Sequence, residues 1–144
     1  MLENKTKRLS VDVRVDVAAE LPRVHGFGSE INQVWEQLID NAIDAAGPNG
    51  RVSVAAALHS DRIEVHVTDD GPGIAEEHRV RVFEPFFTTK PVGQATGLGL
   101  HLARRVVLFH HGDIDFTSEP GRTTFRVRLP RSGVMSSASS PSAL

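Results

Sequence analysis

With 144 residues, of which 40% are hydrophobic and 24% charged, the chain has the size and composition of one globular domain with a single core. A formal net charge of −2 excludes the broadly basic surface of proteins that bind nucleic acid or anionic membranes nonspecifically. The absence of Cys excludes a disulfide framework, a thiolate metal site and a Cys nucleophile.

The sequence also lacks the marks of a membrane or secreted protein. No apolar run approaches the ~20 residues of a membrane span, and the polar start, Met1–Ser10, has no apolar signal-peptide core. We therefore expect a cytoplasmic module without nucleic-acid contact or direct membrane contact.

In the first half of the chain, apolar and polar residues alternate along Leu9–Val17, which predicts a half-buried strand. Apolar residues then recur every three or four positions from Ile31 to Ala46, as in an amphipathic helix. Two further alternating stretches, 52–58 and 63–67, predict a hairpin joined by the polar residues 59–61.

In the second half, a turn is predicted at 69–73 and a short helix at Glu76–Val82. The stretch Glu84–Thr96 has no period and contains Pro and Gly, which predicts a loop. A helix is expected from Gly97 to Phe109, followed by a hairpin from Ile114 to Leu129.

This order of elements predicts an α/β (α+β) two-layer sandwich, with one mixed, mostly antiparallel sheet and helices on one face. We expect residues 1–131 to form the domain and the Ser-rich residues 132–144 to form a flexible tail.

Polar side chains with a possible chemical role occur first on the helix 31–46. Gln37 and Asn41 lie one turn apart and share a face beside the apolar stripe. Asn41 fits either a surface amide next to the core or a ligand of magnesium, which prefers hard oxygen donors.

A second candidate stretch, Asp69-Asp70-Gly71-Pro72-Gly73-Ile74, directly follows a predicted strand. Its two glycines allow a flat ligand to approach the backbone, and Asp69 can accept a hydrogen bond from an exocyclic amine. Asp-Gly and Pro-Gly are also common turn dipeptides, so this stretch alone favours a turn.

Two further stretches suit phosphate binding. Thr96-Gly97-Leu98-Gly99-Leu100 opens a predicted helix, where unpaired backbone N–H groups and the helix dipole attract phosphate. It matches neither a Walker loop nor a Rossmann fingerprint. The segment Phe83–Lys90 holds three of the seven Phe residues, which suggests local packing, and ends in Lys90, a candidate phosphate partner.

In their order and spacing these stretches resemble the motifs of sensor histidine kinases. The matches are Gln33–Ala45 (N box), Asp69–Gly73 (first glycine box), Phe83–Lys90 (F box), Gly97–Leu100 (second glycine box), and His111–Ile114 with Gly121–Pro130 (closing hairpin). The resemblance covers residues 8–130 and implies the Bergerat-type ATP-binding fold, which gyrase, MutL and heat-shock chaperone ATPases share.

The resemblance implies binding of ATP or ADP with Mg²⁺, a base pocket at Asp69, and a mobile lid at Glu84–Thr96. It gives catalytic roles to Asn41, Gln37 and Lys90, and the metal to Asn41 and Gln37. It places nucleotide contacts at Asn41, Asp44, Asp69, Gly71, Gly73, Ile74, Lys90, Thr96, Gly97, Leu98, Gly99, Leu100 and Thr124.

Three positions depart from the family pattern. Gln37 stands where Asn is usual, and its longer amide supplies the same oxygen with a different reach. Ala95 and Arg122 replace glycines, and Ala95 is expected to restrict the lid.

The implied function is that of the ATP-binding catalytic domain of a two-component sensor histidine kinase. Such a domain delivers the γ-phosphate to a histidine on a separate dimerisation and phosphoacceptor hairpin, upstream of a response regulator. None of the seven His residues has the family's acceptor motif, so we expect the acceptor on another segment of a longer parent, soluble or membrane-anchored.

Three alternatives remain. An anti-sigma-type protein-serine kinase has the same fold, but the Phe83–Lys90 string argues against it. A non-catalytic adenine-nucleotide-sensing module would keep the fold without transfer. A hydrolytic clamp, as in MutL or gyrase, would have Glu at the position of Gln37.

Overall fold

The computed structural model describes residues 11–17, 28–88 and 98–130, without the side chains of residues 28–30. The predicted tail, 132–144, lies outside these ranges. The elements are β1 (Asp12–Val17), α2 (Gly28–Ala46), β2 (Arg51–His59), β3 (Arg62–Asp69), α3 (Glu76–Arg79), α4 (Gly99–Phe109), β4 (Asp113–Glu119) and β5 (Arg122–Pro130).

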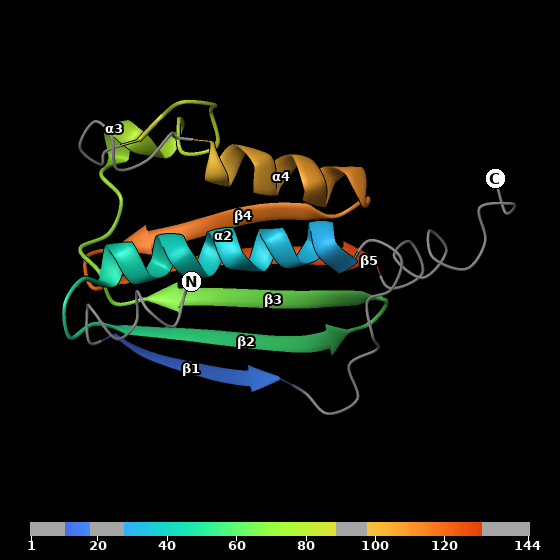
Figure 1. Cartoon of the computed structure of the whole chain (residues 1–144), viewed down its shortest axis with the longest axis horizontal. Coiled ribbons are helices and arrows are strands. Elements are labelled where there is room, and N and C mark those ends of the chain that lie inside the picture. Colours follow the sequence, from blue (N-terminus) through green and yellow to red (C-terminus); the bar gives the residue numbers. More distant parts are fainter. Residues whose placement is uncertain (1–10, 18–27, 89–97, 131–144) are drawn as a thin grey trace, which may run out of the picture.

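The strands form one sheet in the order β1-β2-β3-β5-β4, and α2 and α4 lie on one face of it (Figure 1). β1 runs parallel to β2, whereas β2–β3, β3–β5 and β4–β5 pair antiparallel. The predicted sandwich with a mixed, mostly antiparallel sheet is therefore confirmed.

Helix α2 owes its place to its apolar stripe. Ile31, Val34 and Leu38 recur at helical spacing, and each is 1% exposed or less. The helix ends where Gly47 takes the left-handed conformation, with φ of 72°, and its N–H donates to the carbonyl of Ile43. This is the usual way in which a glycine closes a helix.

The core lies between the helices and the inner face of the sheet. On β5, Phe125, Val127 and Leu129 alternate inward and are almost fully buried. Ala103 and Val107 of α4 complete the same apolar cluster. Among the described residues, no helix is long and apolar enough to cross a membrane.

Helix α3 is shorter than the sequence predicts, since it ends at Arg79 and not at Val82. Beyond it, the N–H of Arg81 bonds the carbonyl of His78, and that of Glu84 bonds the carbonyl of Arg81. These three-residue bonds tighten the chain into successive turns, which bury Val82 to 8% exposure.

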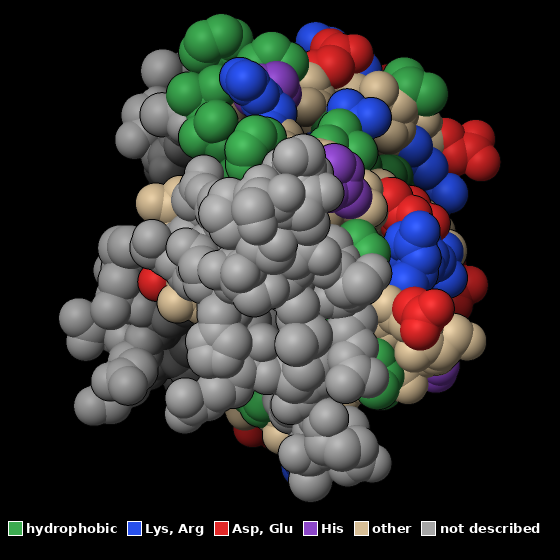
Figure 2. All heavy atoms as spheres, turned by 90° about the vertical axis from the view of Figure 1, so that its right-hand side faces the viewer, with side chains coloured by type: hydrophobic (Ala, Val, Ile, Leu, Met, Phe, Trp, Pro, Cys, Tyr) green, Lys and Arg blue, Asp and Glu red, His purple; other side chains and the backbone are tan. Residues whose placement is uncertain are grey.

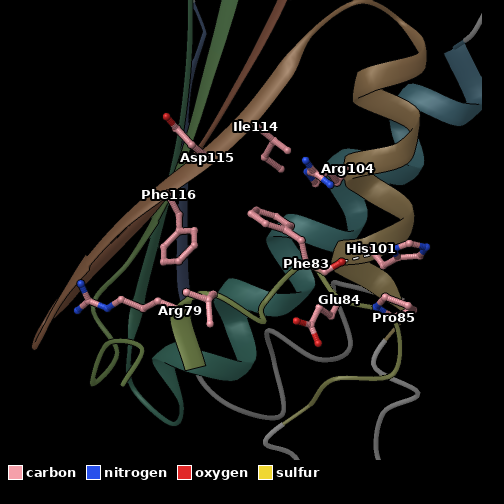
Figure 3. Close-up of a pocket in the computed structure, with 10 residues that line it drawn as sticks. Arg79, Phe83, Glu84, Pro85, His101, Arg104, Ile114, Asp115 and Phe116 are labelled. Atoms are coloured by element: carbon pink, nitrogen blue, oxygen red, sulfur yellow. Dashed lines mark hydrogen bonds between the residues drawn. The ribbon is translucent and has the colours of Figure 1, made fainter. Parts of the chain in front are cut away.

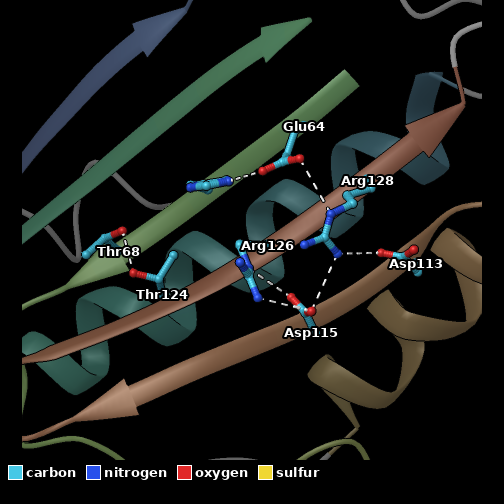
Figure 4. A network of polar contacts seen from close by, with 8 residues as sticks. Glu64, Thr68, Asp113, Asp115, Thr124, Arg126 and Arg128 are labelled. Carbon is cyan, nitrogen blue, oxygen red and sulfur yellow. Dashed lines mark hydrogen bonds and ion pairs between the residues drawn. The ribbon is translucent and has the colours of Figure 1, made fainter. Parts of the chain in front are cut away.

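The outer face of the sheet is polar, and ion pairs join charged residues of β3, β4 and β5 there. Figure 4 shows Arg126 beside Asp115, with bonds of 3.0 and 3.2 Å, and Arg128 bonded to Asp113 at 2.9 Å. Glu64 forms an ion pair with Arg128 and a hydrogen bond with His66. The hydrogen bond with His66 is the largest of the effects that lower the pKa of Glu64.

These pairs are at least partly solvated, so each contributes about 0–1 kcal/mol. The end-on view in Figure 2 shows charged side chains along this outer face, whereas hydrophobic ones gather at the top, over α4. The exposed apolar residues of α4 are Leu102, Leu108 and Phe109.

Candidate functional site

The site is built around Asp69, the last residue of β3. Its side chain lies on the helix side and is 3% exposed, and one carboxylate oxygen accepts a 2.9 Å hydrogen bond from the N–H of Gly71. Burial raises the pKa of Asp69 from 3.8 to about 6, the bond from Gly71 opposes this rise, and the nearby charge of Asp70 adds to it. The result is a buried acceptor with a fixed orientation.

The segment after Asp69, residues 71–74, is packed between two parts of the chain and is called the 71–74 loop below. A β-carbon at Gly71 would collide with the carbonyl oxygen of Ala45, near the end of α2. Gly73 has φ of 90°, and a β-carbon there would lie 2.8 Å from the carbonyl oxygen of Glu119. Close backbone contact thus requires glycine at both positions of the predicted motif. A simple turn would not require glycine at Gly71.

Gln37 lies on the part of α2 that contacts the start of α4. A β-carbon at Gly99 would collide with the side-chain oxygen of Gln37, so this amide rests against the first residue of α4. Asn41 is half-buried one turn further along α2, and Asp44 is half-buried near its end. The structure therefore brings the predicted N box and second glycine box into contact.

These amides suit a hard cation. Within the described ranges there is no cluster of three or more His, Cys, Asp or Glu side chains that could hold a metal ion. The amide oxygens of Asn41 and Gln37 could supply only a few of the ligands of Mg²⁺. Phosphate oxygens and water would supply the others. That is the donor set expected for magnesium bound together with a polyphosphate.

Helix α4 begins at Gly99, and its first turn is closed by the N–H of Leu102 bonding the carbonyl of Leu98. Leu98, Gly99 and Leu100 are half-buried at this end. The other residues predicted to contact phosphate, Lys90, Thr96 and Gly97, lie outside the described residues.

Thr124 is not brought together with Asp69. It lies on the outer face of the sheet, where its hydroxyl is 2.9 Å from that of Thr68 (Figure 4). Its neighbour Thr123 is paired with Asp69 across β3 and β5, is 3% exposed, and has its hydroxyl 2.7 Å from that of Ser118. The alternation of Phe125 and Val127 already indicates that Thr123 is the inward residue.

In the Phe-rich segment, Phe83 packs against the sheet, whereas Phe86 is exposed. Phe83 meets Phe116 and Phe125 edge to face, with ring centroids 6.0 and 6.1 Å apart. Figure 3 shows Phe83 and Phe116 at one cavity of about 580 Å³, to which His101 and Arg104 of α4 also contribute. Asn41, Asp69 and Gly99 do not line this cavity, whereas Arg79 does.

Comparisons with known proteins place this geometry in a family. A family model described as "Histidine kinase-, DNA gyrase B-, and HSP90-like ATPase" matches residues 27–133. The chain is 36% identical over 121 residues to the sensor histidine kinase ZraS of Escherichia coli (strain K12), covering 83% of this chain and 26% of that protein.

Two solved structures are similar as well. The catalytic domain of histidine kinase ThkA has a TM-score of 0.80 at 33% identity, covering 90% of this chain and 85% of that one. The structure of ThkA in complex with response regulator protein TrrA has a TM-score of 0.76 at 29% identity, covering 92% of this chain and 37% of that one.

A mixed sheet with helices on one face is thus the fold of the ATPase domains of this class. The chain belongs to the histidine kinase-, DNA gyrase B- and HSP90-like ATPase family, and within it to the catalytic domains of histidine kinases. It spans 18% to 36% of the length of the first curated relatives that it matches.

Proposed function

We propose that this chain binds Mg²⁺–ATP and delivers the γ-phosphate to a histidine on a separate dimerisation and phosphoacceptor segment of its parent kinase. The observation that carries the proposal is Asp69, a buried carboxylate fixed by Gly71 at the edge of the helix layer. A parent with a response regulator as its downstream partner is supported by the similar kinase ThkA, whose structure holds response regulator protein TrrA.

The base end of the site determines which nucleotide binds. Asp69 accepts a hydrogen bond from the exocyclic amine of adenine, whereas guanine presents a carbonyl oxygen at that position and would be repelled. Gly71, Gly73 and Ile74 line the base pocket. Thr123, in register with Asp69, takes the place of Thr124 among the proposed contacts.

The phosphate end lies where α2 meets the start of α4. Asn41 and Gln37 offer amide oxygens to Mg²⁺, and Asp44 lies one turn beyond Asn41. Residues 96–100 offer backbone N–H groups, and Lys90 a cation, to the phosphates. Magnesium, when bound, supplies positive charge that offsets the charge of the phosphate oxygens.

The histidine acceptor needs no strong base in this chain, because a neutral imidazole is itself a competent nucleophile. The chain's own residues therefore have to bind, orient and screen the triphosphate. This division of roles fits a site that is rich in amide and backbone donors around one buried carboxylate. We place the protein in the cytoplasm, where ATP and response regulators are found.

Nucleotide binding and transfer test the proposal together. Calorimetry should show magnesium-assisted binding of ADP and ATP, weakened about tenfold or more by Asp69→Ala, since a buried charged hydrogen-bond partner contributes about 1.5–3 kcal/mol. With radiolabelled ATP, the chain should label a supplied cognate histidine hairpin as acid-labile phosphohistidine. Equal affinity in wild type and Asp69→Ala, or label found as phosphoserine on a partner protein, would contradict the proposal.

A further inference from the structure

The 71–74 loop is held by a part of the chain 44 residues further along the sequence. The N–H of Ile74 donates a 2.7 Å hydrogen bond to the hydroxyl oxygen of Ser118, near the end of β4. The same hydroxyl is 2.7 Å from that of Thr123. Thr123 is buried and Ser118 is half-buried, so this pair of hydroxyls is partly shielded from solvent at the end of the β4–β5 hairpin.

Arg79 of α3 binds the same two segments from the other side. Its Nε donates to the carbonyl of Ile74 at 3.0 Å, and its Nη2 donates to the carbonyl of Ser118 at 2.8 Å. The planar fork of a guanidinium suits two fixed acceptors at once. Both backbone polar groups of Ile74 are therefore held, one by Ser118 and one by Arg79.

The ends of the contact are closed by backbone alone. The N–H of Gly121 donates to the carbonyl of Gly71 at 2.9 Å, and Gly73 packs against the carbonyl of Glu119. Because these contacts involve backbone atoms only, no substitution can remove one of their partners. Ser118 and Arg79 are thus the removable side chains through which the hairpin and α3 fix the loop.

The structure assigns Ser118 and Arg79 as positioning residues that hold the 71–74 loop and thereby set the orientation of the Asp69 carboxylate. The link is Gly71, whose N–H holds one oxygen of Asp69 and whose carbonyl is held by the hairpin. A loop released at Ile74 would let Gly71 move and would change the direction in which the carboxylate accepts. This inference rests on the proposed binding of adenine at Asp69.

The ratio of ADP to GDP affinity distinguishes a residue that positions Asp69 from one that only stabilises the fold. We expect Ser118→Ala to weaken ADP binding about fivefold to tenfold, as for loss of a typical intramolecular hydrogen bond. GDP binding should change less, so the ADP/GDP affinity ratio should fall. Ser118→Thr keeps the hydroxyl and should restore the ratio. Thr117→Ala removes an exposed hydroxyl one residue earlier and should leave both affinities at the wild-type value.

Two measurements without nucleotide, hydrogen exchange and thermal unfolding, and a pair of Arg79 variants complete the test. In Ser118→Ala the amide of Ile74 should exchange its hydrogen about tenfold faster, because its acceptor is gone. Arg79→Lys, which can reach one carbonyl but cannot span both with one planar group, should lower the ADP/GDP ratio less than Arg79→Leu. Thermal unfolding of each variant gives the part of the effect that is due to stability alone.

The outcomes distinguish this inference from the function on which it rests. If Ser118→Ala lowers the unfolding midpoint but leaves the ADP/GDP ratio unchanged, Ser118 is only structural and the inference fails. If Asp69→Ala abolishes binding while Ser118→Ala and Arg79→Leu do not weaken it, the inference alone fails. If Asp69→Ala also has no effect, the proposed function fails with it.

Discussion

Asp69 and Asp70 are neighbours in the sequence but lie in opposite surroundings. Asp69 faces the helix layer and is buried, whereas Asp70 is exposed and accepts a 2.9 Å hydrogen bond from the N–H of Arg51. The alternation of side chains along a strand is the cause, since it sends consecutive residues to opposite faces. Burial raises the pKa of Asp69 to about 6.

The raised pKa predicts how nucleotide binding depends on pH. Asp69 with a pKa of about 6 is mostly deprotonated at pH 7.5 and mostly protonated at pH 5. Only the deprotonated carboxylate is a full acceptor for the adenine amine. Protonation of Asp69 should therefore lower ADP affinity about tenfold from pH 7.5 to pH 5. Calorimetry across this range measures the effect.

Asp69→Asn is the control, because an amide does not titrate there. It should bind ADP more weakly than wild type at pH 7.5 and lose little further affinity at pH 5. The ratio of the two affinities cancels the titration of the nucleotide itself. A ratio that stays constant with pH would show that Asp69 does not titrate in this range.

Stability without nucleotide should depend on pH with the opposite sign. The pKa of Asp69 is raised above its ordinary value of 3.8, so the folded chain binds this proton more tightly than the unfolded chain. The contribution of Asp69 to stability is then full below about pH 4 and lost as the pH rises through about 6. Asp69→Asn should abolish this contribution in urea unfolding measured at several pH values.

Gln37 predicts weak hydrolysis of ATP by water. Its amide lies against Gly99, where it can orient a water but cannot take its proton. Glu36 is exposed and rotated about 100° around the helix. Steady-state ATPase assays should show low wild-type turnover, no effect of Glu36→Gln, and faster turnover in Gln37→Glu. Brisk wild-type turnover that Glu36→Gln abolishes would identify Glu36 as the base.

At the scale of the elements, Gly71 and Gly99 both pack closely against α2, but against different kinds of atoms. At Gly71 the obstacle to a β-carbon is the backbone carbonyl of Ala45, which the helix holds in place. At Gly99 it is the end of the Gln37 side chain, which can swing away. The two contacts should therefore respond differently to the same substitution.

Gly71→Ala should lower the free energy of unfolding by about 1–3 kcal/mol, as overpacking against rigid atoms does. Gly99→Ala should leave it unchanged or raise it by up to about 1 kcal/mol, because Ala is the better helix residue. The displaced amide in Gly99→Ala should instead reduce the dependence of ATP affinity on magnesium. Urea unfolding and calorimetry with and without magnesium measure the two effects. Equal destabilisation by both substitutions would contradict this account.

The sequence predicts helices and strands well where apolar residues recur with a single helical or strand period. The stripe of α2 and the alternation of β5 correctly place the core and the layered architecture. The short helix 76–82 was predicted too long, because after Arg79 the backbone bonds run from Arg81 to His78 and from Glu84 to Arg81, as in turns. Periodicity over seven residues cannot distinguish a helix from a run of such turns.

The candidate site was predictable where a motif is local. Asp69, Gly71 and Gly73 follow one another, and the structure gives each a physical reason for its identity. The roles of Ser118 and Arg79 were missed, because their bonds join residues far apart in the chain. No pattern in the sequence alone indicates that pairing.

At the scale of the whole molecule, the placement of the histidines predicts no stable autophosphorylation. His110 is 2% exposed, His101 lies 3.3 Å from the carbonyl of Phe83, and His66 is paired with Glu64 on the outer face. None of the seven has the acceptor motif. Incubation with radiolabelled ATP should leave no acid-labile phosphate on the isolated chain, and retained label on any of these histidines would contradict the proposal of an acceptor elsewhere.

The pairing of β3 with β5 has a consequence for folding. Thr68 and Thr124 are 56 residues apart, so this pairing closes a long loop, whereas the β2–β3 and β4–β5 hairpins are local. Asp69 lies on one hairpin and Ser118 and Thr123 on the other, so neither hairpin alone forms the proposed adenine pocket. A ligand that requires both should bind only after they have docked. In stopped-flow experiments ADP should then slow unfolding and leave the refolding rate unchanged.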